Sequence, residues 1–411
     1  MEKLRGACII GQSGGPTAAI NSGAWGVIRA AMAADEITHV YGASHGIVGV
    51  INGDLFDLEQ EDPAELALLP QTPAAALGSC RYRMASPEED DTDYRHILEV
   101  FEKYDVRYFF YIGGNDSMDT CNKISRFMEA EGYDCRVIGI PKTIDNDLMK
   151  TDHCPGYGSA IKYIATSIRE LCCDVNVYVN RTVTIVEIMG RHAGWLAAGA
   201  ALAGVNGAGP DLIYLPECNF NMKKFLKEID RLLRVKTNVM VAVSEGIHYA
   251  DGSYVSEVGL SATDGFGHVQ LGGLAATLAH VVREHTGAKV RGIELSLLQR
   301  CAGHAASAVD IKEAAEAGSA AVAAALSGIT GQMVILKRNA DGADYSCAAD
   351  LCPLSETANR ERKFPREWIN AAENGVTEAY LAYALPLIAG EPEIVRENSL
   401  PRYAKLKRIK A

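Results

Sequence analysis

Two short polar segments, each following an apolar run, carry the side chains of this chain that are best suited to chemistry. They are Gly113-Gly114-Asn115-Asp116-Ser117 and Pro141-Lys142-Thr143-Ile144-Asp145-Asn146-Asp147. If both runs are strands of one parallel sheet, their ends place carboxylates, amides, a lysine and backbone N–H groups side by side. Carboxylates can accept the proton of an attacking hydroxyl, and a lysine can stabilise charge on a phosphoryl group in transfer. Together the two segments indicate phosphoryl transfer.

The first segment could bind a metal ion as well as phosphate. Magnesium prefers oxygen ligands, and Asn115 and Asp116 could each offer one. The charge of Asp116 would also repel the additional phosphate of a nucleotide. Ser117 is placed to cap a helix that begins at Met118. A capped strand-to-helix turn without any ligand is the alternative interpretation, but it leaves Asp116 unexplained.

The second segment could supply a general base. Asp145 is suited to accept a proton from a sugar hydroxyl, and Asp147 could orient it or bind metal. Lys142 would stabilise charge on the transferring group. Because Asp and Asn are also common turn residues, this segment alone could be an ordinary turn. Its pairing with the first segment favours the functional interpretation.

A glycine-rich turn near the N-terminus is a third candidate for phosphate binding. An apolar run ends in Gly11-Gln12-Ser13-Gly14-Gly15-Pro16, ahead of a predicted helix. Glycines at such a turn let backbone N–H groups approach an anion at the positive end of the helix. The spacing matches neither the Walker A pattern nor the dinucleotide fingerprint. The turn therefore favours phosphate binding without predicting a nucleotide cofactor.

Several charged residues elsewhere could bind an anionic substrate. Arg191 and Glu245 directly follow apolar runs, which favours a role in a site over a surface ion pair. Taken singly, the other arginines are more often surface ion-pair residues. His192 is predicted to begin a helix and to be satisfied by backbone contacts. The further arginine candidates are Arg81, Arg291 and Arg300.

These residues need a scaffold, and the apolar pattern predicts an α/β fold with doubly wound parallel sheets. Apolar runs of strand length alternate with helical segments, the pattern of βαβ units. The strands are expected at 7–10, 108–112, 137–140, 183–188, 212–215, 239–243 and 333–336. The helices are expected at 17–34, 117–131, 159–171, 222–233, 274–284 and 307–326. The small-residue stretch 193–205 is too short to span a bilayer and is expected to be a buried helix.

Composition limits the kinds of partner and the cellular compartment that can be expected. A chain of 411 residues that is 48% hydrophobic can form two or three domains, and we expect two lobes and a cleft. Its formal charge of −12 argues against a nucleic acid or an anionic membrane as a partner. Its eleven cysteines show no zinc-site spacing and are predicted to be reduced thiols in a cytoplasmic protein.

Taken together, the motifs resemble the phosphofructokinase family from residue 7 to about residue 336. The resemblance implies two Rossmann-like lobes: 1–155 plus about 300–345 for the phosphoryl donor, and 156–299 for the sugar phosphate. Residues 346–411 would wrap the surface. The matching residues are Ser13-Gly14-Gly15, Gly78-Ser79-Cys80-Arg81, the two polar segments, Val186-Glu187-Ile188-Met189-Gly190-Arg191, Glu245 and Gln299-Arg300.

The resemblance also implies a role for each candidate residue. By it, Asp145 is the general base toward the 1-hydroxyl of fructose 6-phosphate, supported by Thr143 and Asp147. Mg²⁺ would be bound by Asn115 and Asp116. The implied ligands of the donor are Gly14, Gly15, Arg81, Gly114 and Lys142. The implied ligands of the sugar phosphate are Thr143, Asp145, Met189, Gly190, Arg191, Glu245, Arg291 and Arg300.

Two positions distinguish the donors that the family uses. The ATP-using branch has glycine in place of Asp116 and commonly glycine in place of Lys142, whereas the pyrophosphate-using branch resembles this chain at both. A reversible, glycolytic transfer from pyrophosphate is therefore expected, in a homodimer or homotetramer. An ATP-dependent enzyme and a catalytically weak regulatory subunit are the alternatives. Asn115 and Leu297 depart from the family pattern and are the features that favour the regulatory subunit. Leu297, in place of a usual ligand of the 6-phosphate, also leaves sedoheptulose 7-phosphate open as the acceptor.

Overall fold

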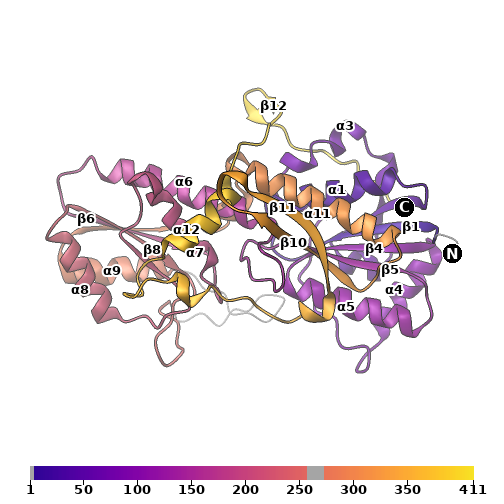
Figure 1. Ribbon diagram of the computed structural model, residues 1–411, viewed down its shortest axis with the longest axis horizontal. Coiled ribbons are helices and arrows are strands. Elements are labelled where there is room, and N and C mark those ends of the chain that lie inside the picture. The colour runs from indigo at the N-terminus through magenta and orange to yellow at the C-terminus, as the bar shows by residue number, and fades with distance from the viewer. Residues whose placement is uncertain (1–3, 257–272) are drawn as a thin grey trace.

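The computed structural model describes residues 4–256 and 273–411, which form two α/β lobes joined end to end (Figure 1). The larger lobe is built on a seven-stranded sheet and the smaller lobe on a four-stranded sheet. The α/β class and the two doubly wound lobes expected from the sequence are thus confirmed.

The larger sheet has the strand order β11-β10-β5-β4-β1-β2-β3. Its inner pairs are parallel, whereas β2–β3 and β10–β11 are antiparallel. The central strands are almost wholly buried, as expected for parallel strands that are covered on both faces. The strands are β1 (Gly6–Gln12), β2 (Ile37–Ala43), β3 (Leu55–Asp57), β4 (Val106–Gly113), β5 (Arg136–Pro141), β10 (Gln332–Ala340) and β11 (Ser346–Pro353).

Helices cover both faces of this sheet because side chains alternate along each strand. In β4, Tyr108 and Phe110 pack with α1 and α11, whereas Phe109 and Tyr111 pack with α4 and α5. The helices of this lobe are α1 (Ile20–Met32), α2 (Ile47–Ile51), α3 (Pro63–Leu66), α4 (Thr92–Lys103), α5 (Asn115–Ala130) and α11 (Ala308–Leu326).

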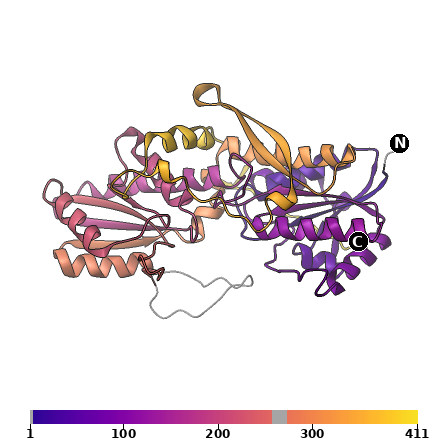
Figure 2. The same ribbon diagram turned by 60° about the horizontal axis from the view of Figure 1, so that its bottom comes forward.

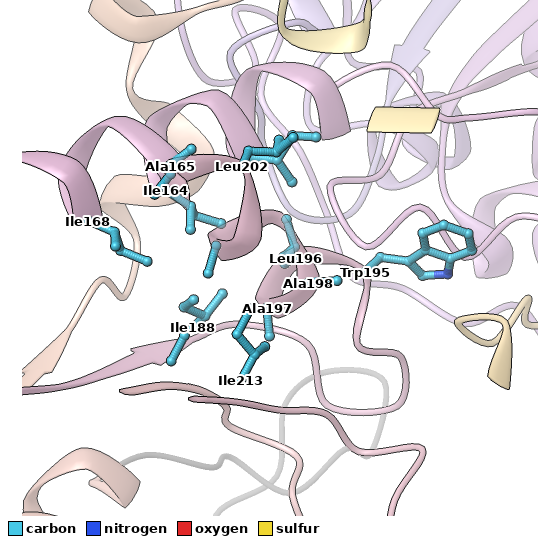
Figure 3. Close-up of a cluster of buried hydrophobic side chains, with 14 of the residues drawn as sticks. Ile164, Ala165, Ile168, Ile188, Trp195, Leu196, Ala197, Ala198, Leu202 and Ile213 are labelled. Carbon is cyan, nitrogen blue, oxygen red and sulfur yellow. The ribbon is translucent and has the colours of Figure 1, made fainter. Parts of the chain in front are cut away.

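The smaller sheet is wholly parallel, in the order β7-β8-β6-β9. Its strands are β6 (Thr182–Ile188), β7 (Leu212–Tyr214), β8 (Asn238–Ser244) and β9 (Lys289–Glu294). One face packs on α8 (Met222–Leu233) and α9 (Leu274–Thr286). The other packs on α6 (Tyr157–Val175) and α7 (Trp195–Gly199), where Figure 3 shows Ile164 and Ile168 above Ile188. The short helix α10 (Leu298–Cys301) follows β9.

The last part of the chain connects the two lobes. After β11 it crosses to the smaller lobe and forms α12 (Glu378–Ala384), whose Tyr380 packs in the core with Trp195. It then returns past the hairpin of β12 (Arg396–Glu397) and β13 (Leu400–Pro401) to the larger lobe. There Lys410 forms an antiparallel bridge with Phe56. The chain beyond residue 346 therefore contributes a strand to the larger sheet before it wraps the surface.

Most expected elements occur, with two corrections. The helix expected from Ser117 begins at Asn115 with Gly114 as its N-cap, so Ser117 is not the cap. The stretch 193–205 is not one helix, because α7 passes directly into a 3₁₀ segment. Within the part of the chain that the structure describes, no helix is long and apolar enough to cross a membrane.

Candidate active site

A cavity of about 600 Å³ lies between the lobes. Most of the residues singled out from the sequence line it, although they come from seven separate stretches of chain. They are Gly14, Gly15, Arg81, Gly114, Asn115, Asp116, Lys142, Thr143, Asp145, Asp147, Met189, Arg191, Glu245 and Arg300. The side chains that were selected because they follow strands thus lie around one cavity.

The glycine turn after β1 packs directly against basic side chains. Gly14 has φ 75°, a backbone conformation that favours glycine. A Cβ atom there would lie 3.3 Å from Nζ of Lys142, and one on Gly15 would lie 3.3 Å from Arg300. The N–H of Gly14 donates to the carbonyl of Cys80 at 3.1 Å, so it is already engaged within the protein. The absence of side chains at this turn thus lets Lys142 and Arg300 lie close to its backbone.

Lys142 is a buried cation, 3% exposed, at the centre of this group. Its Nζ donates to the carbonyl of Gly15 at 2.8 Å. Burial lowers the pKa of Lys142 to about 8; Asp145 opposes this shift, and the cations Arg300 and Arg81 add to it. Three cations close enough to affect one another give this part of the cavity a local positive charge in an acidic protein.

The two aspartates after β5 have raised proton affinity. Burial raises the pKa of Asp145, and the neighbouring carboxylate of Glu245 raises it further. Thr143 Oγ1 accepts from the N–H of Asp145 at 3.1 Å and donates to its Oδ2 at 3.4 Å. Burial, Asp145 and Glu361 raise the pKa of Asp147 to about 7. Carboxylates with raised pKa values are better suited to accept a proton near neutral pH.

The conformation of the residue between them holds both aspartates at the cavity. Asn146 has φ 53°, in the left-handed region that asparagine tolerates. Its buried side chain accepts from the N–H of Cys154 at 2.9 Å and donates to the hydroxyl of Tyr383 at 3.0 Å. Oδ1 of Asp147 is buried and has no hydrogen-bond partner among the described residues. An unpaired carboxylate oxygen in this position is available to a substrate or a metal.

The smaller lobe contributes the ends of β6 and β8. Glu245 Oε1 accepts from the N–H of Gly190 at 3.3 Å, and Ser244 donates to the carbonyl of Gly190. Met189 N–H donates to Gln299 Oε1 at 3.2 Å. Gly190 itself supports Glu245 rather than lining the cavity. Nε of Arg191 is buried and has no partner among the described residues, so it can donate to a ligand.

The two arginines expected to grip the distal phosphate lie in different places. Arg300 lines the cavity, where burial and the nearby Arg81 lower its pKa. Arg291 on β9 does not line it and pairs with Asp174 at 3.5 Å. Leu297 is 53% exposed. Within one copy of the chain, the cavity therefore contains only one of the two arginines.

Eight lining residues were not predicted as ligands. Those with charged, imidazole or amide side chains are Arg83, His192, Asn359 and Glu361. His192 pairs through Nδ1 with the carboxylate of Glu361 at 3.0 Å. It lies before α7, which begins at Trp195, so the expectation that it begins a helix was wrong. The hydrogen bond with His192 lowers the pKa of Glu361 to about 2. Glu361 lies far along the chain in a coil, where no periodicity or strand end marks it.

The lining residues offer oxygen atoms suited to a divalent metal. Asp116, in the first turn of α5, has a carboxylate at the cavity. Asn115 Oδ1 accepts from the backbone N–H of Arg360 at 3.1 Å. Because a charged carboxylate attracts a divalent cation more strongly than a neutral amide oxygen, Asp116 fits the role of a ligand better than Asn115.

The fold and the site are those of a two-lobed phosphotransferase, and comparison with known proteins shows the family. The family model described as phosphofructokinase matches residues 7–325, and the chain belongs to that family. A pyrophosphate–fructose 6-phosphate 1-phosphotransferase of Halomonas elongata is 43% identical over 96% of this chain and 94% of that protein. Its counterpart in Xanthomonas campestris pv. campestris is 44% identical over 98% and 97%.

A solved structure agrees with these sequence relatives. The crystal structure of a pyrophosphate-dependent phosphofructokinase from Marinobacter aquaeolei matches with a TM-score of 0.89 at 39% identity. The match covers 99% of this chain and 97% of that one. The resemblance inferred from the motifs, including the pyrophosphate-using branch, is confirmed.

Proposed function

We propose that this protein transfers a phosphoryl group from pyrophosphate to the 1-hydroxyl of fructose 6-phosphate, giving fructose 1,6-bisphosphate and phosphate. The observation that carries the choice of donor is the presence of Asp116 and Lys142 in one cavity. Asp116 would repel the α-phosphate of a nucleotide, whereas Lys142 beside Arg81 and Arg300 can balance the compact charge of pyrophosphate.

The aspartate pair provides an acceptor for the proton of the 1-hydroxyl. As the 1-oxygen attacks the nearer phosphorus, its proton passes to Asp145, and the bond from that phosphorus to the bridging oxygen breaks. The leaving phosphate keeps the bonding electrons. Asp147 has its raised pKa beside Asp145 and can hold the base in position. Lys142 and the unpaired Nε of Arg191 would stabilise the charge that moves between the oxygens. In the reverse direction Asp145 returns the proton.

Mg²⁺ fits the site at Asp116, with Asn115 as the weaker candidate. When bound, it would neutralise charge on the oxygens of the donor. Glu245, Met189 and Arg191 are placed to contact the sugar, and Arg300 its distal phosphate. Sedoheptulose 7-phosphate is the alternative acceptor, because Leu297 replaces a polar phosphate ligand of the family.

We also propose a cytoplasmic homodimer or homotetramer. All eleven cysteines are free thiols, as expected in a reducing compartment. Val177 and Val179 are 72% and 87% exposed on the loop before β6. Leu297 and Leu298, after β9, are more than half exposed. Apolar side chains flanking an edge strand favour an interface, and a role for Arg291 in phosphate binding would require a site close to it.

The test is product formation by purified protein with fructose 6-phosphate and magnesium. Turnover with pyrophosphate and none with ATP is expected. Turnover with ATP alone would overturn the roles given to Asp116 and Lys142. If neither donor supports turnover, assays with sedoheptulose 7-phosphate follow. Failure of both acceptors would favour the regulatory subunit. Sedimentation analysis of the same preparation measures the oligomeric state.

A further inference from the structure

A short coil lines part of the cavity and contacts both lobes. We call residues 359–364 the cleft segment. Figure 1 shows the chain passing from the neighbourhood of α5 to the smaller lobe at this point, and Figure 2 shows the same crossing from a second side. Asn359 and Glu361 of this segment line the cavity. The segment is thus part of the wall of the site, not only of the outer surface.

Hydrogen bonds tie each end of the cleft segment to a different lobe. At the larger lobe, Asn359 Nδ2 donates to Asp119 Oδ1 on α5 at 2.8 Å. At the smaller lobe, Lys363 Nζ donates to the carbonyl of His192 at 2.7 Å, and Phe364 N–H donates to Glu217 Oε1 at 2.9 Å. A movement of one lobe against the other must therefore break or stretch these bonds.

Arg362, between these ends, holds the loop that carries the aspartates. Its guanidinium donates to the carbonyl of Asn146 through Nη2 at 2.8 Å and through Nε at 3.1 Å. Nη1 donates to the carbonyls of Thr151 and Asp152, both at 2.7 Å. The backbone N–H of Arg362 donates to the carbonyl of Asp147 at 2.6 Å. One residue thus ties down both ends of the stretch 146–152.

The same residue faces the smaller lobe. The carbonyl of Arg362 accepts from Nε1 of Trp195 at 3.1 Å. Its guanidinium carbon lies 4.6 Å from the centre of the Trp195 ring, within the range of a cation–π contact. Figure 3 shows Trp195 projecting from the start of α7, away from the other labelled side chains of that core. Arg362 therefore connects the base-bearing loop with a fixed aromatic ring of the opposite lobe.

We propose that Arg362 is a positioning residue for Asp145 and Asp147, coupling their location to the smaller lobe that binds the sugar phosphate. The proposal rests on the function proposed above. The loop from 142 to 156 has almost no regular secondary structure, so its carbonyls need other donors. A planar guanidinium can serve three carbonyls at once, whereas the ammonium group of lysine is a compact point charge with a different geometry.

The charge of Arg362 has a second, separable effect. Asp147 faces the carboxylates of Asp145 and Glu361, which raise its pKa, whereas Arg362 lowers it. The charge of Asp147 also raises the pKa of Lys142, against the effect of burial. Removing the positive charge at 362 should therefore raise the pKa of Asp147 and shift the acid limb of kcat/KM for fructose 6-phosphate to higher pH. Arg362→Lys keeps the charge and should leave this limb in place.

The experiment compares Arg362→Lys and Arg362→Met with Arg360→Gln. Arg360 is exposed on the same segment, and its backbone N–H donates to Asn115 Oδ1, so Arg360→Gln removes a charge without removing this bond or the bonds of Arg362. In the pyrophosphate assay, both Arg362 variants should lose kcat by about 10–100-fold, since a misplaced base reacts slowly. KM for both substrates should stay within about threefold, and Arg360→Gln within about twofold of the wild type in kcat.

The outcomes separate this proposal from the proposed function. If the wild type turns over pyrophosphate and Arg362→Lys retains full kcat, the positioning role is wrong although the function stands. Equal losses in kcat and affinity, with a lowered melting temperature in both variants, would indicate a merely structural role. A loss of kcat in Arg362→Lys with an unmoved acid limb, and a limb moved to higher pH in Arg362→Met, would support the proposal. An inactive wild type would overturn the function itself.

Discussion

The alkaline limb of the pH profile provides a sharp test of the site, because one buried lysine should set it. Burial lowers the pKa of Lys142 from 10.5 to about 8. This change corresponds to about 3 kcal/mol by which the site disfavours the cation before substrate binds. Above about pH 8 an increasing share of the enzyme therefore has a neutral Lys142 and binds pyrophosphate poorly. Bound pyrophosphate supplies negative charge, which should raise the pKa again.

The measurement is kcat/KM for pyrophosphate from pH 6 to 10, at saturating fructose 6-phosphate. It should fall about tenfold for each unit above about pH 8, while kcat should fall only at higher pH, since the pKa is raised in the complex. Pyrophosphate itself titrates in this range, so the diagnostic comparison is with Lys142→Arg. A guanidinium is not deprotonated under these conditions, and the limb due to residue 142 should disappear.

Two results would refute this reasoning. One is a kcat/KM profile for the wild type that stays level past pH 9. The other is an alkaline limb of equal position in the wild type and in Lys142→Arg. Either would mean that the charge of Lys142 does not control donor binding, and the role of this residue in donor choice would have to be abandoned.

Three further predictions concern the donor, the base and the turn. The double variant Asp116→Gly with Lys142→Gly should gain turnover with ATP while losing it with pyrophosphate, and an unchanged ATP rate would count against repulsion as the cause of donor choice. Asp145→Asn should lower kcat by about 10²–10⁴-fold with little change in KM, measured by steady-state kinetics at neutral pH; a loss under threefold would assign the base elsewhere. Gly14→Ala should lower the free energy of unfolding by about 1 kcal/mol, because φ is 75° at this position and the added Cβ would approach Lys142. Chemical denaturation measures this change, and no destabilisation would mean that the turn relaxes.

The strands that are easiest to find from the sequence are those buried on both faces. The central strands β4 and β5 are buried on both faces, so each is a continuous apolar run that stands out from its neighbours. Among the strands that sequence reasoning missed, β2 is an inner strand with a mixed burial pattern, whereas β3, β9 and β11 lie at sheet edges. β9, with the sequence KVRGIE, buries only Val290, and β11 is largely exposed on an antiparallel edge. Neither forms an apolar run, and their pairing depends on contacts that are distant in sequence.

The same distinction holds for the active site. Lys142, Asp145 and Glu245 could be predicted because a parallel sheet places residues that follow its strands at one edge. Glu361 and Arg362 could not, because their location depends on the path of a coil. That path is fixed by packing against the smaller lobe, where Phe364 contacts Trp195 with ring centres 5.1 Å apart. No local pattern near residue 361 carries this information.

The distribution of charge explains why the two lobes have to be tied together at the cleft. The cations that face the donor, Lys142 and Arg81, belong to the larger lobe, whereas Arg191 and Glu245 belong to the smaller lobe. Phosphoryl transfer requires both sets to act on one pair of oxygens at the same moment, and a displacement of about 1 Å can cost about 10²-fold in rate. Across the cleft, Glu245 of the smaller lobe raises the pKa of Asp145 of the larger lobe, and this repulsion between carboxylates of different lobes would favour an open cleft. Bonds from one short segment to both lobes oppose that opening, and the segment that makes them also holds the loop of the base.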